Sequence, residues 1–239
     1  MEVINYLLGY KDLKIIQDPD MFCFSLDSVL LPQFVTLNLN EKKILDIGCG
    51  NAPMPLILST RTSAKIVGVE IQKEIYELAQ KTIQINNKED QISIIHGDIK
   101  ELYKTWESDC FDVIVCNPPF FKVNKESRLN VSDQRKLARH EITLNLEDIM
   151  KISRKLLKNN GVLGIVHRPE RLIDILLLMR KNNIEPKKIQ FIYPKIGSDA
   201  NILLIEGRKN GKLGLKILKP LITHNSDGGY TDEIKKYFE

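Results

Sequence analysis

Short runs of apolar and β-branched residues alternate along the chain with stretches of helical periodicity. The apolar runs predict seven strands, at residues 43–47, 64–70, 92–96, 111–116, 161–167, 189–193 and 202–207. Helical spacing predicts helices at residues 54–60, 73–86, 146–157 and 169–182. Continuously apolar strands separated by helices are typical of an α/β fold with a doubly wound, mostly parallel sheet that helices cover on both faces.

Length and composition agree with one globular domain over residues 1–239. The chain is 43% hydrophobic and 28% charged, which is ordinary for a folded protein. No apolar run reaches the roughly 18 residues of a membrane span, and the N-terminus lacks the pattern of a signal peptide. We therefore expect a cytoplasmic protein without membrane association, and we infer no obligate protein partner.

Cysteines and histidines give no sign of a metal site. The four cysteines form no CxxC pair and the four histidines are scattered, so zinc-ligand spacing is absent. The formal net charge of +4 conceals an asymmetry, because residues 1–121 carry 11 basic and 17 acidic residues and residues 122–239 carry 24 and 14. Such an asymmetry is a weak indication of nucleic-acid contact, and a solvated Lys-rich face explains it about equally well.

A glycine-rich turn follows the first predicted parallel strand. Gly48 and Gly50, separated by one residue, allow a tight turn and a close approach of a ligand to the backbone. In doubly wound folds ligands bind at the carboxyl ends of the strands. A dinucleotide fingerprint requires a third glycine where this chain has Pro53, so the turn does not match that class.

Three carboxylates follow three successive predicted strands. Asp46, Glu70 and Asp98 would repel a pyrophosphate and favour a ligand with hydroxyl groups, amines and positive charge. S-adenosylmethionine fits this description, and Glu70 is placed to accept hydrogen bonds from its ribose diol. The alternatives are that Asp46 and Asp98 only cap helices and that Glu70 is a solvated strand end.

The fourth strand ends in Asn117-Pro118-Pro119-Phe120. Proline fixes φ and donates no backbone hydrogen bond, so this turn presents acceptors, the Asn117 side-chain oxygen and the Pro118 carbonyl. Two acceptors that hold the N–H groups of a planar exocyclic amine favour the pyramidal nitrogen of a methyl-transfer transition state. Phe120 offers a face on which a base that has swung out of its stack can lie.

These features resemble the class I S-adenosylmethionine-dependent methyltransferases of the Asn-Pro-Pro-aromatic type, which have a Rossmann-like fold. Further stretches resemble one branch of that family, the bacterial tRNA (adenine-N6)-methyltransferases that act on valine tRNA. They lie at residues 18–34, 138–148, 167–174 and 184–205 and in the C-terminal GLKILKPLITH and GGYTDEI. The similarity spans nearly the whole chain.

The resemblance implies transfer of a methyl group to N6 of the adenine directly 3′ of the anticodon. It implies that Asn117, Pro118, Pro119 and Phe120 hold the target base. The implied cofactor-binding residues are Ser25, Asp27, Asp46, Gly48, Gly50, Glu70, Ile71, Asp98, Ile99 and Asn117. Residues 1–40 would be an N-terminal extension over the cofactor site, with the segment around Ser25 and Asp27 closing over the methionine end of the cofactor.

A polar, basic connection begins directly after the Asn-Pro-Pro-Phe turn. Its candidates for contact with substrate RNA are Phe121, Lys122, Lys125, Arg128, Arg135, Arg139 and His140. Phosphate backbones attract such positive surface, and the contribution weakens with salt. Alternatively, Arg139 and His140 form a local salt-linked structure beside Glu141.

Three other functions use parts of the same pattern. A protein glutamine-amide methyltransferase would use the same pair of acceptors, although such enzymes more often carry Tyr at the aromatic position and a separate N-terminal domain. DNA adenine methylation is less favoured because the chain offers no large target-recognition domain. A non-catalytic RNA-binding protein on the same scaffold is disfavoured because both the cofactor turn and the Asn-Pro-Pro-Phe turn are intact.

Overall fold

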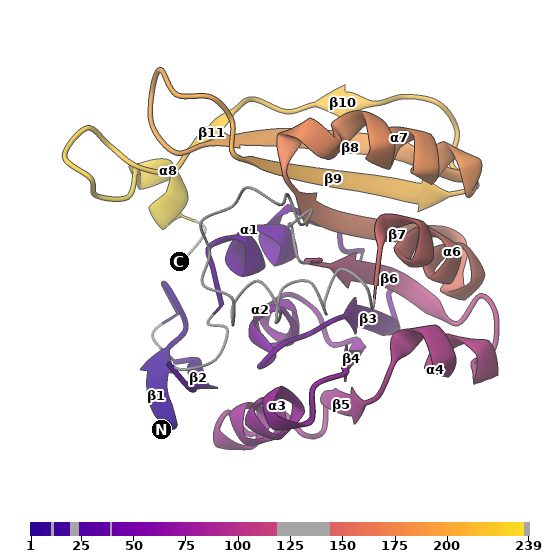
Figure 1. Ribbon diagram of the computed structural model, residues 1–239, viewed down its shortest axis with the longest axis horizontal. Helices are drawn as coiled ribbons and strands as arrows, with labels where there is room; N and C mark the ends of the chain where they lie inside the picture. The colour runs from indigo at the N-terminus through magenta and orange to yellow at the C-terminus, as the bar shows by residue number, and fades with distance from the viewer. Residues whose placement is uncertain (11, 20–23, 39, 119–143, 237–239) are drawn as a thin grey trace, which may run out of the picture.

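The computed structural model describes residues 1–10, 12–19, 24–38, 40–118 and 144–236 (Figure 1). In this part of the chain a nine-stranded sheet has the order β10-β8-β9-β7-β6-β3-β4-β5, with β11 beside β8. The strands are β3 Lys43–Ile47, β4 Lys65–Glu70, β5 Ile92–His96, β6 Phe111–Cys116, β7 Leu157–His167, β8 Ile184–Tyr193, β9 Ile202–Lys209, β10 Lys216–Ile217 and β11 Leu221–Ile222. Only β9 runs antiparallel to its neighbours in this described sheet, so the predicted doubly wound, mostly parallel fold is confirmed.

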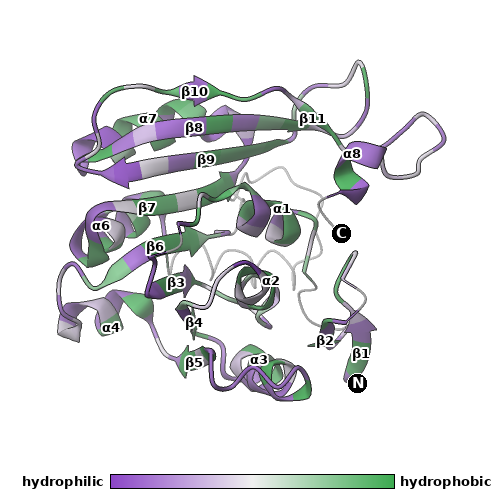
Figure 2. Cartoon of the chain, turned by 180° about the vertical axis from the view of Figure 1, so that it is seen from behind, coloured by the Kyte–Doolittle hydropathy of each residue, from purple (hydrophilic) through white to green (hydrophobic). Residues whose placement is uncertain are grey.

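Helices cover both faces of the sheet. The described helices are α1 Asp27–Phe34, α2 Pro53–Arg61, α3 Lys73–Ile85, α4 Ile99–Thr105, α6 Leu146–Leu156, α7 Leu172–Lys181, α8 Asp232–Lys235 and the 3₁₀ turn η1 Pro169–Arg171. Neighbouring strand residues face opposite cores: Ile44 belongs to the core that includes residues of α1, α2 and α3, whereas Leu45 belongs to the core that includes residues of α4, α6 and α7. Hydrophobic residues, green in Figure 2, accordingly concentrate along the central strands β6 and β7. No helix within the described ranges has the length and apolar character needed to cross a membrane.

The differences from the predicted elements have local causes. β7 begins at Leu157 rather than at residue 161. Its first residues are mostly polar, so they do not belong to the apolar run from which the strand was predicted. α1 was not predicted from helical spacing, because nearly all of its residues are buried and Pro32 lies inside it. β10 and β11 extend the sheet edge with two residues each, which is too short to leave a periodicity. The predicted helix at 169–182 divides into η1 and α7.

A separate hairpin of β1 Val3–Tyr6 and β2 Lys14–Gln17 precedes the sheet. β2 attaches to α3, because the Ile16 amide donates to Thr82 Oγ1 at 3.1 Å. It also attaches to the glycine-rich turn, since Asn51 Nδ2 donates to the Ile16 carbonyl at 2.8 Å. The hairpin and the turn after β3 therefore hold each other in place.

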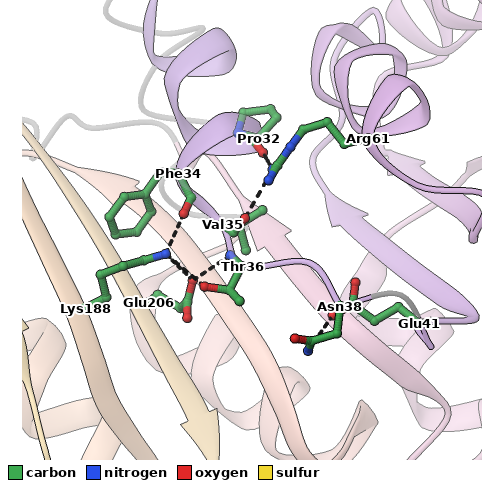
Figure 3. A network of polar contacts seen from close by, with 9 residues as sticks. All are labelled: Pro32, Phe34, Val35, Thr36, Asn38, Glu41, Arg61, Lys188 and Glu206. Carbon is green, nitrogen blue, oxygen red and sulfur yellow. Dashed lines mark hydrogen bonds and ion pairs between the residues drawn. The ribbon is translucent and has the colours of Figure 1, made fainter. Parts of the chain in front are cut away.

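Two cations hold the C-terminal end of α1. Arg61, at the end of α2, donates from its guanidinium to the carbonyls of Pro32 and Val35 (Figure 3). Carbonyls in the last turn of a helix have no partner within the helix, and a nearby cation also complements the helix dipole. Arg61 thus fixes α1 to α2.

Lys188 of β8 makes the second attachment. Its Nζ donates to the Phe34 carbonyl at 2.6 Å and to Thr36 Oγ1 at 2.9 Å, and it lies 2.9 Å from Glu206 Oε2 of β9 (Figure 3). The Thr36 amide donates to the same Glu206 oxygen at 2.7 Å. The ion pair itself joins β8 to β9, and the bonds from its two members to Phe34 and Thr36 attach the end of α1 to the sheet. Glu206 is only 3% exposed, so the pair contains a buried charge.

Candidate functional site

The carboxyl ends of three neighbouring strands meet at one edge of the sheet. Ile47 of β3 lies opposite Val69 of β4 and Cys116 of β6. The segments that follow these strands therefore leave the sheet side by side. β3 and β6 are also the point where the strand order reverses, which is where doubly wound sheets bind their ligands.

The turn after β3 requires glycine for its conformation. Gly48 has φ of 71° and Gly50 has φ of 57°, a left-handed region that side chains other than glycine adopt with strain. A Cβ at either position would meet nothing within 4 Å, so open space borders the turn. The Gly48 amide donates to the Val69 carbonyl at 3.0 Å, which ties the turn to β4. Pro53 then opens α2, where a missing N–H costs little.

Glu70 is fixed beside this turn by backbone donors. Its Oε2 accepts from the Gly50 amide at 3.1 Å and its Oε1 accepts from the Gln72 amide at 2.8 Å. The side chain is buried, so it is not a solvated strand end. Each carboxylate oxygen keeps acceptor capacity beyond its one backbone donor.

Asp46 and Asp98, which the sequence treats alike, differ in the structure. Asp98 Oδ1 accepts from the Lys100 amide at 2.8 Å and caps α4. Asp46 is fully buried, and among the described residues neither of its carboxylate oxygens has a hydrogen-bond partner. Burial raises the pKa of the Asp46 carboxyl well above its ordinary range, and the charge of Glu70 raises it further. Helix capping therefore accounts for Asp98 but not for Asp46.

An unpartnered, buried carboxylate beside a second carboxylate calls for a ligand with positive charge and hydrogen-bond donors. S-adenosylmethionine carries a sulfonium, an ammonium group and a ribose diol, and Gly48 and Gly50 leave room for it next to the backbone. The residues at this edge therefore fit that cofactor.

Asp46→Asn separates the stability of the protein from its affinity for a cation. A carboxyl whose pKa is raised in the folded state loses stabilisation as the pH rises above its ordinary value of 3.8. We therefore expect the variant without ligand to unfold at a higher temperature than wild type at pH 8, with a difference that shrinks toward pH 4. Affinity for S-adenosylmethionine should fall about tenfold or more, because a bond to a charged acceptor is lost. Differential scanning calorimetry and isothermal titration measure the two effects, and an Asn variant that melts below wild type at pH 8 would contradict the argument.

Asn117 leaves β6 at the same edge. Its Nδ2 donates to Ser28 Oγ of α1 at 3.0 Å, and Ser28 is buried. Pro118 is buried as well, so the turn is anchored on both sides of Asn117. Because the side-chain nitrogen is bonded to Ser28, the side-chain oxygen is the atom available to another group.

The remaining predicted site residues lie in different parts of the structure or outside the described residues. Asp27 begins α1 and is buried, which raises the pKa of its carboxyl, while the charge of Arg168 and a hydrogen bond with Ser25 oppose that rise. Ile71 follows Glu70 and is exposed, whereas Ile99 is buried in the core beside α6. The residues predicted to hold the base or the RNA that lie outside the described residues are Pro119, Phe120, Phe121, Lys122, Lys125, Arg128, Arg135, Arg139 and His140.

His167 ends β7, the neighbour of β6, and the sequence analysis gave it no separate role. It is 3% exposed, and its Nδ1 accepts from the Arg168 amide at 2.8 Å. Burial and the charge of Arg171 lower the pKa of the imidazole to about 4. The ring is therefore neutral near pH 7 and presents Nε2–H as a donor.

Protonation of His167 should make the protein sensitive to acid. A histidine whose pKa is depressed in the folded state gives stability that is lost as the pH falls from its ordinary 6.5 through about 4. We expect the free energy of unfolding, measured in urea, to fall by about 2–3 kcal/mol from this residue over that range. His167→Gln should lack this component, whereas His96→Gln, at an exposed histidine, should retain it. Parallel pH profiles for wild type and His167→Gln would contradict the assignment.

Two residues of this edge were missed by sequence reasoning. Ser28 follows the predicted Asp27 by one position, but no local pattern indicates that its hydroxyl faces Asn117, which is 89 positions away. Asn51 lies inside the glycine-rich turn, and its bond to β2 depends on a hairpin that the sequence did not predict. The contacts of Ser28 and Asn51 form only in the folded chain, because packing brings their distant partners next to them.

Comparisons with known proteins point the same way. The family model of the methyltransferase small domain matches residues 12–181. A tRNA1(Val) (adenine(37)-N6)-methyltransferase of Flavobacterium psychrophilum is 33% identical over 184 residues, 77% of this chain and 77% of that enzyme. An enzyme of the same name from Parabacteroides distasonis is 28% identical over 202 residues, 84% of this chain and 83% of its own. A solved structure of a predicted O-methyltransferase of Agrobacterium tumefaciens has a TM-score of 0.70 at 18% identity and covers 89% of this chain and 95% of its own.

The family match extends from β2 to the end of α7 and so includes every strand end described at this edge. Identity of 33% over 77% of the chain goes beyond likeness of fold. The predicted class of enzyme and its S-adenosylmethionine cofactor are thereby confirmed. The chain belongs to the methyltransferase small domain family, within the class I S-adenosylmethionine-dependent methyltransferases.

Proposed function

We propose that the protein transfers a methyl group to N6 of adenine 37 of valine tRNA, the reaction named for the relatives from Flavobacterium psychrophilum and Parabacteroides distasonis. One observation carries the chemical part of the proposal. Asn117 Nδ2 donates to Ser28 Oγ, and within the described ranges no bond is made by the side-chain oxygen, which can therefore accept from a substrate at the edge where Asp46 and Glu70 lie. An acceptor beside a site suited to a cationic methyl donor is what methylation of an exocyclic amine requires.

The proposed mechanism uses hydrogen-bond acceptors rather than a strong base. S-adenosylmethionine supplies an electrophilic methyl group. Asn117 Oδ1 and the Pro118 carbonyl accept the two N–H groups of the adenine amine, which favours the pyramidal nitrogen that attacks the methyl carbon. As the new nitrogen–carbon bond forms, the bond from the methyl carbon to the sulfonium sulfur would break and leave S-adenosylhomocysteine. The nitrogen would then lose one proton to water, so no dedicated strong base is needed. The neutral imidazole of His167 leaves this edge without an added positive charge near pH 7.

The cofactor has proposed partners on each strand end. Glu70 would accept from the ribose hydroxyls, because its carboxylate is already oriented by the Gly50 and Gln72 amides. Asp46 would face the positive part of the cofactor, which gives its unpartnered oxygens a counter-charge. Asp98 would offer the oxygen that its cap leaves over. Residues 1–40 would cover the site, and the bond between Asn51 and Ile16 supports this placement.

The basic half of the chain supplies the proposed RNA surface. Residues 122–239 carry 24 basic and 14 acidic residues, and the segment 121–140 follows the Asn-Pro-Pro-Phe turn directly. Binding of tRNA should therefore weaken steeply with salt, while binding of the cofactor should change little.

The decisive experiment offers the enzyme several acceptors at once. The protein is incubated with methyl-labelled S-adenosylmethionine and with tRNA, total protein or plasmid DNA in separate reactions, and the labelled products are digested and identified. We expect N6-methyladenosine in tRNA, and within tRNA at adenine 37 of the valine isoacceptor. Label in protein glutamine or in DNA adenine would mean that tRNA is not the substrate. The proposed role of Asn117 and Pro118 as hydrogen-bond acceptors for the substrate amine would still stand. No label in any acceptor, together with no cofactor binding at millimolar concentration, would refute the enzymatic proposal.

A further inference from the structure

We propose that Arg168 binds a phosphate group next to the target adenine when the substrate is seated for methyl transfer. This inference rests on the proposed function, because it requires that the substrate be a nucleic acid. Arg168 directly follows β7, and Asn117 directly follows the neighbouring parallel strand β6. The two residues therefore leave adjacent strands at the same edge of the sheet.

The start of α1 connects Arg168 with Asn117. Ser28 Oγ lies 3.0 Å from Asn117 Nδ2. Asp27, the preceding residue, interacts with Arg168: burial raises the pKa of the Asp27 carboxyl, and the charge of Arg168 opposes that rise. Two consecutive residues of one helix thus reach Asn117 and Arg168, which places the arginine close to the methyl-transfer site.

The packing of α1 on β7 explains this arrangement. A Cβ added to Gly164 of β7 would lie 3.4 Å from Leu31 Cδ1, so the helix lies directly on the strand. Asp27 precedes Leu31 by about one helical turn, and Arg168 follows Gly164 at the end of the strand. Because the helix begins where the strand ends, Asp27 and Arg168 meet at the same edge.

The guanidinium of Arg168 is oriented by the backbone. Its NH1 donates to the Asn201 carbonyl at 2.9 Å, and Asn201 directly precedes β9, whose start pairs with the end of β7. The carbonyl is neutral, so this bond orients the guanidinium without cancelling its charge. A guanidinium has five N–H donors in one plane, and two of them match two oxygens of a phosphate.

The acidic groups at this edge give such a cation a role. Asp27, Asp46 and Glu70 are buried here. They favour a cationic cofactor, and each of them that is ionised repels a phosphodiester brought next to the target adenine. A positive charge at Arg168 offsets this repulsion where the substrate must approach.

The shape of a nucleotide agrees with the separation of the two groups. A base reaches the site only when its nucleotide leaves the stack, which also brings the flanking phosphates to the protein. The exocyclic amine and the phosphates lie at opposite ends of an adenosine nucleotide. With the amine at Asn117, a flanking phosphate has a partner in Arg168 on the other side of the start of α1. The other oxyanion that a guanidinium would bind here is the carboxylate of the cofactor, and the test distinguishes the two.

Arg168→Gln is the first test, with binding of valine tRNA measured by filter binding at several salt concentrations. Loss of a charged hydrogen-bond donor should raise the dissociation constant for tRNA about tenfold or more, whereas that for S-adenosylmethionine should stay within about twofold. The slope of log K against log salt concentration should become shallower by about 0.7 to 0.9, the share of one phosphate contact.

Arg180→Gln is the matched control. Arg180 is an exposed arginine near the end of α7, which leads away from this edge, and its NH2 donates to Glu185 Oε1 at 2.9 Å. The control should keep the tRNA affinity and the salt slope of wild type. An unchanged tRNA affinity and salt slope in Arg168→Gln would overturn the inference. Weaker cofactor binding with unchanged tRNA binding would assign Arg168 to the carboxylate of the cofactor and would also overturn it.

A chemical double-mutant cycle separates phosphate binding from a purely structural pairing of Arg168 with Asp27. Valine tRNA is assembled by ligation with one neutral methylphosphonate, placed either 5′ or 3′ of the target adenine. One of the two modified tRNAs should bind wild type about tenfold more weakly than unmodified tRNA. The same change should cost Arg168→Gln less than about twofold. An equal loss in both proteins would show that Arg168 does not contact that phosphate and would overturn the inference.

The modified tRNAs also test the inference with the wild-type protein alone, which covers the case in which Arg168→Gln does not fold. If neither methylphosphonate weakens binding to wild type, the inference is overturned. The proposed function fails separately: wild type that methylates protein glutamine and not tRNA would refute the tRNA substrate. Methylation of tRNA by wild type and by Arg168→Gln with equal KM would refute only the role of Arg168.

Discussion

Asn117→Ala is expected to lower kcat for methyl transfer to tRNA by about 10²- to 10³-fold, the range seen when one preorganised hydrogen-bonding group is removed from a transition state. The alanine has no acceptor for the substrate amine, and the Pro118 carbonyl alone holds only one of its N–H groups. Cofactor affinity should fall much less than kcat, because Asn117 is only one of the implied cofactor-binding residues and most of the proposed contacts lie on the turn after β3 and on Glu70. Single-turnover transfer of labelled methyl groups and isothermal titration measure the two quantities.

The control for this variant is an asparagine far from the edge. Asn159 is an exposed residue of β7 that accepts from Asn210 through its side chain, and Asn159→Ala should keep the turnover of wild type. Filter binding should show that Asn117→Ala still binds tRNA with an affinity close to that of wild type. Near-normal turnover in Asn117→Ala would rule out the acceptor mechanism, whatever the substrate.

Lys188→Met is expected to have the largest effect on stability. It leaves Glu206, which is 3% exposed, without the cation 2.9 Å away. A buried charge that loses its partner typically costs several kcal/mol, and we expect the free energy of unfolding to fall by about 3 kcal/mol. The Phe34 carbonyl would also lose a donor at the end of α1. Urea denaturation at pH 7 measures the change.

Two companions distinguish the buried charge from a general effect of losing lysine. Lys187 is the neighbour of Lys188, and the contacts described for its Nζ are the carbonyls of Lys212 and Leu213 at the surface. Lys187→Met should therefore cost less than about 1 kcal/mol. Adding Glu206→Gln to Lys188→Met removes the unpaired charge and should restore part of the lost stability. A loss of similar size in both single lysine variants would contradict the role of the ion pair.

Much of the fold was predictable because the signals that specify it are local. The seven predicted strands follow from apolar runs of a few residues, and each is present. α1 was not predicted, because a helix buried on nearly all sides has no polar face and so no helical period. The hairpin β1–β2 was missed for another reason: it attaches to α3 and to Asn51, partners that lie far along the chain.

The candidate site was predictable as a set of residues but not as an arrangement. Gly48 and Gly50 indicate a turn, because left-handed backbone conformations favour glycine. The sequence offered the same two interpretations for Asp46 and Asp98, and only the structure separates a buried, unpartnered carboxylate from a helix cap. Segment 119–143 lies outside the described residues, so the predicted base-stacking and RNA-binding roles stay predictions.

The sequence by itself determined seven strands of the sheet and the helices α2, α3, α6 and α7 in their order along the chain, the glycine-rich turn and the position of Asn117 after the fourth predicted strand. These features depend on residues only a few positions apart, so the hydrophobic periodicity and the turn-forming residues of the sequence predict them. Only the tertiary structure decided which carboxylate stays unpaired and which hydroxyl meets Asn117. The contact between Ser28 and Asn117 joins residues 89 positions apart, and it arises from the packing of α1 against the sheet, which no local pattern encodes.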